Sequence, residues 1–216
     1  MSKDDPEARE KYLTNTHDAY RLFYTVLLTI GLSLGFNSVL TEFRRLSVSN
    51  FGRELPTLLT FSVFLLVVLR FFLGGVRHLD TTYLETDFTK ITESQVSSQR
   101  FRAVDISMLL FDAGIIIILG GLVTMPYRFF TVFAVLLLID GLWGILISYQ
   151  MGSLALHNDP ATQTKWGINN GGHFGLFVLG LAFAQWPVLV VLGFSNSLVD
   201  LYWTFDSYFP PLVHEE

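Results

Sequence analysis

The sequence contains no cysteine among its 216 residues. Disulfide frameworks, thiolate metal sites, cysteine nucleophiles and iron–sulfur clusters are therefore excluded. Charged side chains are also scarce, at 15% of residues against about 25% in a typical soluble protein. The net charge of −5 comes without a basic patch, so the sequence has no footprint for nucleic-acid binding.

Hydrophobic residues, in contrast, make up 51% of the chain and gather in apolar runs of about 20 residues, long enough to cross a bilayer. We therefore expect an all-α polytopic membrane protein, with a lipid bilayer around a single transmembrane domain at residues 20–209. Residues 1–19 are polar and of mixed charge, which is unlike a signal peptide and typical of a solvated N-terminal segment. We expect residues 210–216 to form a C-terminal tail.

The apolar pattern predicts about six transmembrane helices that pair as three hairpins. The last apolar region is too long for one helix. We divide it at Pro187, because proline removes a helical hydrogen bond and disfavours a helical conformation in the residue before it. The alternative is five spans followed by an amphipathic C-terminal helix, because polar side chains interrupt the last segment. The predicted spans are residues 20–43, 56–78, 106–124, 127–149, 168–185 and 187–209.

The distribution of Lys and Arg near the span ends predicts the orientation, because cytoplasmic loops carry more of these residues. Most of them lie on the side of the N-terminus. We therefore expect both termini and the polar loop at residues 80–104 to face the cytoplasm, with the protein in the plasma membrane. The Arg residues on the other side are Arg44, Arg45, Arg53 and Arg128.

Proline opens the second helix of each predicted hairpin, at Pro56, Pro126 and Pro187, where its missing N–H costs nothing. From these prolines, a step of about 14 residues along the hairpin helices leads repeatedly to an ionisable side chain. Such a step corresponds to about 20 Å of helix, so these side chains would share one layer in the inner half of the membrane. The predicted polar layer consists of Arg70, Asp112, Asp140, His173 and Asp200.

A charge inside the bilayer costs about 2.5 kcal/mol or more, so these side chains should face protein or water. Arg70 always carries its proton and needs acceptors, which the aspartates supply. One Arg with three Asp leaves the layer negative unless a carboxylate is protonated, His173 is charged or a cation binds. The functional interpretation is a pathway for protons or cations. The alternatives are a buried salt-bridge cluster that only fixes helix register, or headgroup contact by snorkelling of Arg70 and Asp200.

The remaining motifs are weaker. No H-E-x-x-H pair or other close spacing marks a metal site, so any metal ligand stays unknown. His173 is the histidine well inside a span, and haem would need a second one facing it; we predict no cofactor. Asn169 and Asn170 should distort the start of the fifth span, and aromatic residues such as Tyr208 should form interfacial belts. Small-xxx-small spacing predicts close helix packing, or secondarily a dimer contact, at Gly31, Gly35, Gly171 and Gly175.

Taken together, these patterns favour a small membrane transport or channel-forming protein that passes protons or cations beside the acidic layer. Six short spans are too few to enclose a pore within one chain, so we expect a homo-oligomer. The competing hypothesis is a non-catalytic membrane subunit or effector that anchors or responds to a cytoplasmic protein partner through residues 1–19 and 80–104. An intramembrane metal- or haem-dependent enzyme comes third, since no catalytic residue is identified.

Overall fold

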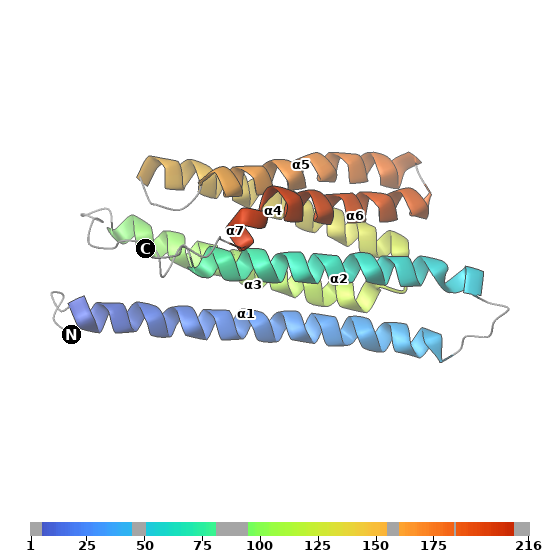
Figure 1. Ribbon diagram of the computed structural model, residues 1–216, viewed down its shortest axis with the longest axis horizontal. Helices are drawn as coiled ribbons and strands as arrows, with labels where there is room; N and C mark the ends of the chain where they lie inside the picture. The colour runs from blue at the N-terminus through green and yellow to red at the C-terminus, as the bar shows by residue number, and fades with distance from the viewer. Residues whose placement is uncertain (1–5, 45–50, 81–94, 155–159, 184, 210–216) are drawn as a thin grey trace, which may run out of the picture.

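The structure, a computed structural model, describes residues 6–44, 51–80, 95–154, 160–183 and 185–209. Seven α-helices account for nearly all of these residues (Figure 1), which confirms the predicted all-α class. The helices are α1 (Pro6–Phe43), α2 (Phe51–Leu79), α3 (Gln95–Leu122), α4 (Pro126–Leu154), α5 (Pro160–Phe183), α6 (Trp186–Trp203) and α7 (Phe205–Tyr208).

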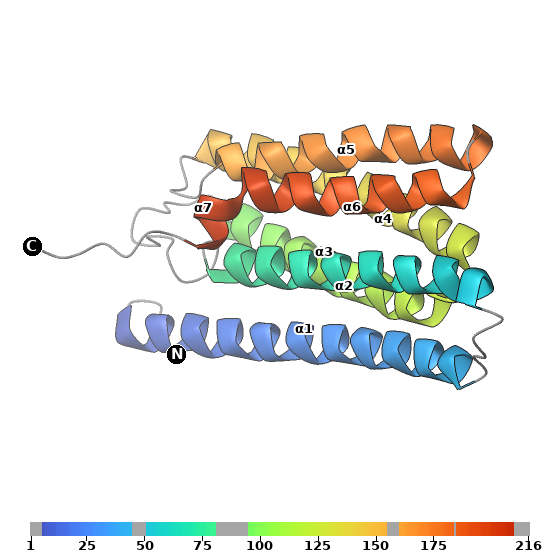
Figure 2. The same ribbon diagram turned by 45° about the vertical axis from the view of Figure 1, so that its right-hand side comes forward.

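The six long helices lie side by side in an elongated bundle. Helices α1, α3 and α5 begin at one end, which we call the proximal end, whereas α2, α4 and α6 begin at the other, the distal end (Figure 1). In the turned view, α1 and α5 lie on opposite sides of the bundle with the other helices between them (Figure 2). Helix α1 packs on α3 and α2, α4 packs on α5, and α6 lies against α5 and α2.

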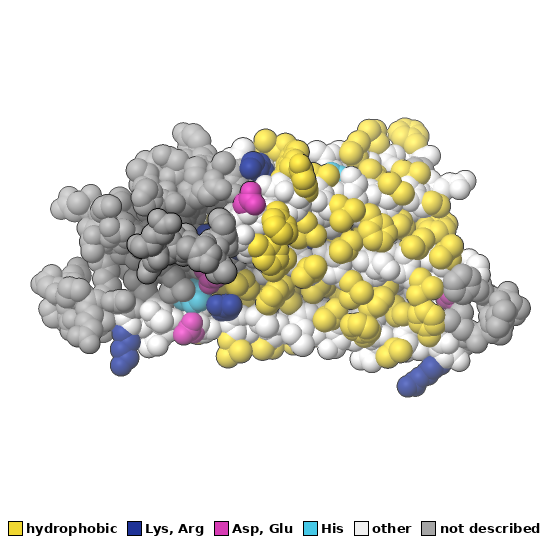
Figure 3. All heavy atoms as spheres, viewed as in Figure 1, with side chains coloured by type: hydrophobic (Ala, Val, Ile, Leu, Met, Phe, Trp, Pro, Cys, Tyr) yellow, Lys and Arg dark blue, Asp and Glu magenta, His cyan; other side chains and the backbone are white. Residues whose placement is uncertain are grey.

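The surface of this bundle suits a bilayer. Within the described ranges, three stretches are long and apolar enough to cross a membrane, Thr14–Phe43, Glu54–Leu79 and Pro126–Leu146, and Ile106–Leu122 is a shorter apolar stretch. Hydrophobic side chains cover much of the middle and distal part of the visible face, with charged side chains towards its two ends (Figure 3). A lipid bilayer is the solvent that such a surface matches.

The helices extend further than the apolar runs. Helix α1 begins at Pro6, so much of the predicted polar segment at residues 1–19 continues the first long helix. Helix α3 begins at Gln95, inside the predicted loop at residues 80–104. Hydrophobicity marks only the part of a helix that lipid can cover. The backbone hydrogen bonds of a helix are internal, so the helix can extend beyond the membrane into water. Residues 1–5, 81–94 and 210–216 lie outside the described part of the chain.

The prolines have different positions from one hairpin to the next. Pro126 opens α4, and Pro187 lies in the first turn of α6 after an extended Gln185. Helix α5 therefore ends before α6 begins, and the two run antiparallel (Figure 2). The prediction that Pro56 opens its helix was wrong, because α2 begins at Phe51. The carboxylate of Glu54 in the first turn favours this earlier start, since it complements the helix dipole.

The expected distortion at Asn169 and Asn170 was also wrong. Helix α5 begins at Pro160, a residue suited to the first turn, so both asparagines lie inside a continuous helix. Their side-chain amides therefore project from a regular helix, between the proximal and distal ends of the bundle.

A cluster of aromatic rings fills the core on the distal side of Arg70. Phe64 of α2 lies edge-on to Phe129 of α4, with ring centroids 6.3 Å apart, and Phe130 stacks on Phe177 of α5 at 5.8 Å. Phe133 completes the group, and all five side chains are buried. Along their own helices these rings lie about two to three turns distal of the residues around Arg70, and they fill that part of the core with apolar packing.

Candidate functional site

Arg70 lies at the centre of the bundle on α2, and its side chain is 0% exposed. Its guanidinium carbon lies 5.1 Å from the ring centroid of Phe71 and 5.9 Å from that of Trp166, which shield it on two sides. Because a guanidinium is always charged and carries five N–H donors, it is stable here only with acceptors around it.

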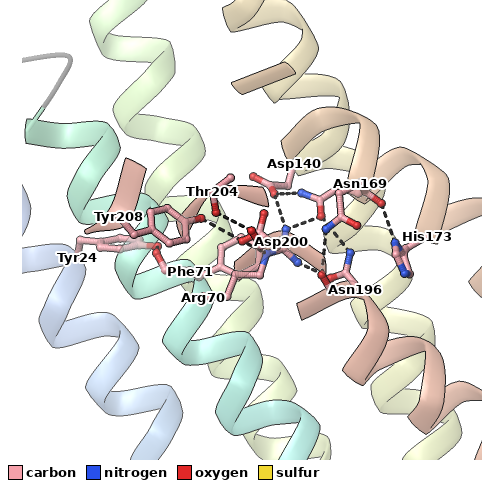
Figure 4. A network of polar contacts seen from close by, with 11 residues as sticks. Tyr24, Arg70, Phe71, Asp140, Asn169, His173, Asn196, Asp200, Thr204 and Tyr208 are labelled. Carbon is pink, nitrogen blue, oxygen red and sulfur yellow. Dashed lines mark hydrogen bonds and ion pairs between the residues drawn. The ribbon is translucent and has the colours of Figure 1, made fainter. Parts of the chain in front are cut away.

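Two carboxylates from different helices supply the countercharge. The Nε atom of Arg70 lies 3.1 Å from Asp200 Oδ2 on α6, and its Nη2 atom lies 3.8 Å from Asp140 Oδ2 on α4. Asp140 and Asp200 are 4% and 1% exposed. Helices α2, α4 and α6, one from each predicted hairpin, therefore meet at this point (Figure 4).

Two buried asparagines complete the contacts of the guanidinium. Arg70 Nη1 donates to Asn196 Oδ1 on α6, and Nη2 donates to Asn170 Oδ1 on α5. Asn170 Nδ2 in turn donates to Asp140 Oδ2, and Asn196 Nδ2 lies 3.3 Å from Asn170 Oδ1. We call this set the Arg70 cluster: Arg70, Asp140, Asn170, Asn196 and Asp200.

The network continues to the distal side through α5. Asn169 Nδ2 donates to the backbone oxygen of Asn196 at 2.9 Å, and His173 Nδ1 lies 3.0 Å from the backbone oxygen of Asn169. A carbonyl only accepts, so Nδ1 donates to it, and His173 Nε2 lies 3.2 Å from Ser195 Oγ. These two contacts orient the imidazole of His173 beside the cluster (Figure 4).

The network continues to the proximal side through Tyr208 and Thr204. Tyr208 Oη donates to Asp200 Oδ2 at 3.0 Å, and Thr204 Oγ1 donates to the backbone oxygen of Asp200 at 2.6 Å. Nearby, Tyr24 Oη of α1 donates to the backbone oxygen of Phe71 at 2.8 Å. Polar groups therefore extend along the bundle axis on both sides of Arg70.

The structure brings Arg70, Asp140 and Asp200 of the predicted layer together through the two ion pairs of the guanidinium. Asp112 is buried on α3. His173 lies about one turn distal of Asn170. Because α5 ends at Phe183 and not at Gln185, the same count along α5 reaches Asn169 and Asn170.

Sequence reasoning missed Asn170 and Asn196 as ligands of the guanidinium, because only ionisable residues were sought at that depth. A usable signal existed in α6. Asn196 precedes Asp200 by one helical turn, and residues at that spacing share a face. Tyr208 was predicted to anchor at the interface, but its hydroxyl turns inward to Asp200.

The charges of the Arg70 cluster do not balance when both carboxylates are ionised. One guanidinium then faces two negative groups, which leaves an excess negative charge in a buried place. Among the described residues, Asp200 Oδ1 is a buried oxygen with no hydrogen-bond donor. The arrangement can therefore hold one proton, and it needs no additional space to do so.

Metal binding finds no support in the described ranges, where no group of three or more His, Asp or Glu side chains is arranged to hold an ion. The carboxylates of the Arg70 cluster instead face a fixed positive charge. That charge disfavours a second cation in direct contact with them.

The two predicted glycine pairs lie in different surroundings. A Cβ at Gly31 would lie 3.2 Å from the backbone of Ile116 on α3, and one at Gly35 would meet the ring of Phe64. Gly171 and Gly175 are exposed on α5, and a Cβ there would meet nothing within 4 Å. The first pair thus lies at contacts within the chain, and the second faces outward.

A second polar cluster joins α1 to the end of α2 near the proximal end. His17 is buried, with Nε2 2.8 Å from Asp80 Oδ1 and Nδ1 3.1 Å from Asp18 Oδ1. Arg21 Nη1 lies 3.8 Å from the same Asp80 oxygen. This cluster holds the two helices together at some distance from Arg70.

Comparison of the chain with protein-family models, with curated proteins and with solved structures found no match. Function is therefore inferred from the geometry of the Arg70 cluster.

Proposed function

We propose that this protein is a small proton-transporting membrane protein and that the Arg70 cluster is its proton-binding site. One observation supports this above all. A fully buried guanidinium is shared by two buried carboxylates from α4 and α6, so the cluster carries one unbalanced negative charge when both carboxylates are ionised. An ionisable group at this depth in a membrane typically marks an ion or proton pathway.

The proposal includes six spans in one transmembrane domain, at residues 20–209. Beside the three candidate spans, α3, α5 and α6 would cross as well. Helix α6, with 18 residues, is about 27 Å long, close to the thickness of the hydrocarbon core. The excess of Lys and Arg around the proximal loops supports placing that end, with both termini, in the cytoplasm of a cell bounded by the plasma membrane.

A proton suits the site better than a larger cation. The carboxylates already contact Arg70 and an asparagine, and a proton occupies no volume between them. Protonation of Asp140 or Asp200 removes the excess charge and weakens one ion pair with Arg70, so α4 or α6 is held less firmly to α2. Loss of the proton restores the pair. The site thus supplies two states that differ by one proton, as transport requires.

We also propose a homo-oligomer, because one bundle of six short spans encloses little space. The open glycines Gly171 and Gly175 on the outer face of α5 support this, since small residues let a neighbouring helix approach closely.

The second candidate function is a membrane subunit that transports nothing. It is favoured by the complete enclosure of the cluster within one chain, because a closed network of this kind can fix helix register alone. In that case a cytoplasmic protein would bind residues 1–19 and 80–104, parts of which lie outside the described ranges. An intramembrane enzyme remains the third hypothesis.

Proton flux into liposomes distinguishes the first two functions. Purified protein should acidify liposomes that contain a pH-sensitive dye when a potassium diffusion potential drives proton entry. Asp140→Asn and Asp200→Asn, which cannot take part in proton exchange, should each lower the initial rate about 10-fold or more.

Asp206→Asn is the matched control, because Asp206 is an exposed carboxylate on α7 close in sequence to Asp200, and its flux should equal that of the wild type. Flux that is unchanged in both cluster variants would refute the proposed site. A wild type no faster than empty liposomes, together with a soluble protein that co-purifies in fixed ratio, would favour the subunit.

A further inference from the structure

The short helix α7 is tied to the backbone of Asp200. After α6 ends at Trp203, Thr204 turns the chain, and α7 folds back against α2 and α6 at their proximal ends (Figure 1). The N–H and the Oγ1 hydroxyl of Thr204 both donate to the Asp200 backbone oxygen, at 3.0 and 2.6 Å. The position of α7 is therefore coupled to the residue whose carboxylate belongs to the Arg70 cluster.

Helix α7 places the Tyr208 side chain between that carboxylate and the proximal end. Tyr208 Oη donates to Asp200 Oδ2, the same oxygen that lies 3.1 Å from Arg70 Nε. Gly74 of α2 leaves the space for it, since a Cβ at this position would lie 3.2 Å from Tyr208 Oη. Figure 4 shows the Tyr208 ring beside Asp200, on the opposite side of the cluster from His173.

Access to the cluster differs between its two sides. On the distal side, beyond the contacts of Asn169 and His173, buried apolar rings that include Phe64, Phe130 and Phe177 fill much of the core. On the proximal side, Tyr208 is mostly buried but partly exposed. Tyr208 therefore combines a direct hydrogen bond to a cluster carboxylate with partial exposure.

We propose that Tyr208 relays protons between Asp200 and water on the proximal side. This inference rests on the proposed proton transport and names the residue through which protons enter or leave. A phenol can do this because its oxygen both donates and accepts a hydrogen bond.

The relay step is balanced. The O–H bond of Tyr208 breaks as its proton bonds to Asp200 Oδ2, while a hydronium ion on the proximal side gives a proton to the Tyr208 oxygen and becomes water. The two transfers occur together, so Tyr208 stays neutral. Release of a proton from Asp200 is the same step in reverse.

Tyr208→Phe tests the relay, because it keeps the ring and removes the hydroxyl. Its initial rate of proton flux into liposomes should fall about 10-fold or more. Tyr202→Phe is the matched control: Tyr202 lies on α6 with its side chain 82% exposed, and its loss of a hydroxyl should leave the flux unchanged.

A second variant separates a relay from a packing role. Tyr208→Ala opens the space beside Asp200, and imidazole added to the proximal buffer should restore flux by carrying protons in place of the phenol. A residue that only packs would show no such rescue. Tyr208→Phe should also unfold within a few degrees of the wild type, because one hydrogen bond contributes about 1 kcal/mol.

Two results would overturn the relay while leaving the proposed function in place. One is normal flux in Tyr208→Phe beside a large loss in Asp200→Asn. The other is a loss of flux in Tyr208→Ala that imidazole does not restore. Normal flux in both Asp140→Asn and Asp200→Asn would instead overturn the proposed function and the relay with it.

Discussion

At the scale of single residues, the guanidinium of Arg70 holds the centre of the bundle together. It donates to two asparagines and faces two aspartates, so four groups on three helices depend on one side chain. Removing one partner of a buried ion pair leaves an uncompensated charge, which is much more destabilising than replacing the whole pair. Arg70 should therefore matter for stability as well as for transport.

Arg70→Met should lower the free energy of unfolding by about 3–5 kcal/mol, because Asp140 and Asp200 are left buried without a countercharge. Unfolding in mixed detergent micelles measures this. Arg70→Lys should have a smaller effect, since an ammonium keeps the charge but not the fork of donors. Arg128→Met, at an exposed position on α4, serves as the control. A stable Arg70→Met protein would show that the pairs contribute little.

The depth of these side chains in the membrane could be predicted from the sequence, but the direction in which each one points from its helix could not. The rise per residue is fixed, so counting from the turns placed Arg70, Asp140 and Asp200 at a similar height. Each residue also turns the side chain by about 100°, and a small error in helix bounds changes the direction that it faces. Asn170 and Asn196, which accept hydrogen bonds from Arg70, were therefore not predicted, although they lie close to its depth.

At the scale of helices, glycines decide how closely α1 and α3 approach. A Cβ at Gly120 of α3 would collide with the backbone oxygen of Gly31 on α1. Backbone atoms move much less easily than the end of a side chain, so the contact has no room for a methyl group. The spacing of Gly31 and Gly35 was visible in the sequence, whereas the partner helix was not, because small-residue spacing does not specify what packs against it.

Gly120→Ala should destabilise the protein by about 1–3 kcal/mol, because the added methyl group forces α1 away from α3. Gly121→Ala is a close control: it is the next residue of the same helix, and a Cβ there meets nothing within 4 Å. Alanine also favours a helix over glycine, so this variant should be neutral or slightly stabilising. Equal unfolding midpoints for the two variants would contradict the packing described for Gly120.

Helix ends show which boundaries a sequence can reveal. Pro187 marks a stop in the hydrogen-bond ladder, and the helices do separate just before it. Pro6 and Gln95 begin helices inside polar segments, where no change in hydrophobicity occurs. Pro56 resembled a start but lies inside α2, because the residues before it continue the helix outward.

At the scale of the whole molecule, an apolar exterior surrounds a charged interior. Helix α1, with 38 residues, is about 57 Å long and exceeds the thickness of the hydrocarbon core, so its polar start extends beyond the membrane. The two sides of the interior differ: aromatic rings lie beyond the His173 contacts on the distal side, and Tyr208 lies on the proximal side of the cluster. On the proposed relay, a proton bound at Asp200 would exchange first with the proximal solution.

The most direct test of the central claim is infrared spectroscopy of the purified protein in lipid during a pH titration. We expect the carbonyl band of a buried protonated carboxyl group. This band should appear on acidification, disappear at higher pH and be absent from Asp140→Asn or Asp200→Asn. Asp206→Asn should keep the band, because that carboxylate is exposed. If Asp140 and Asp200 stay ionised at every pH at which the protein is folded, the Arg70 cluster does not carry protons.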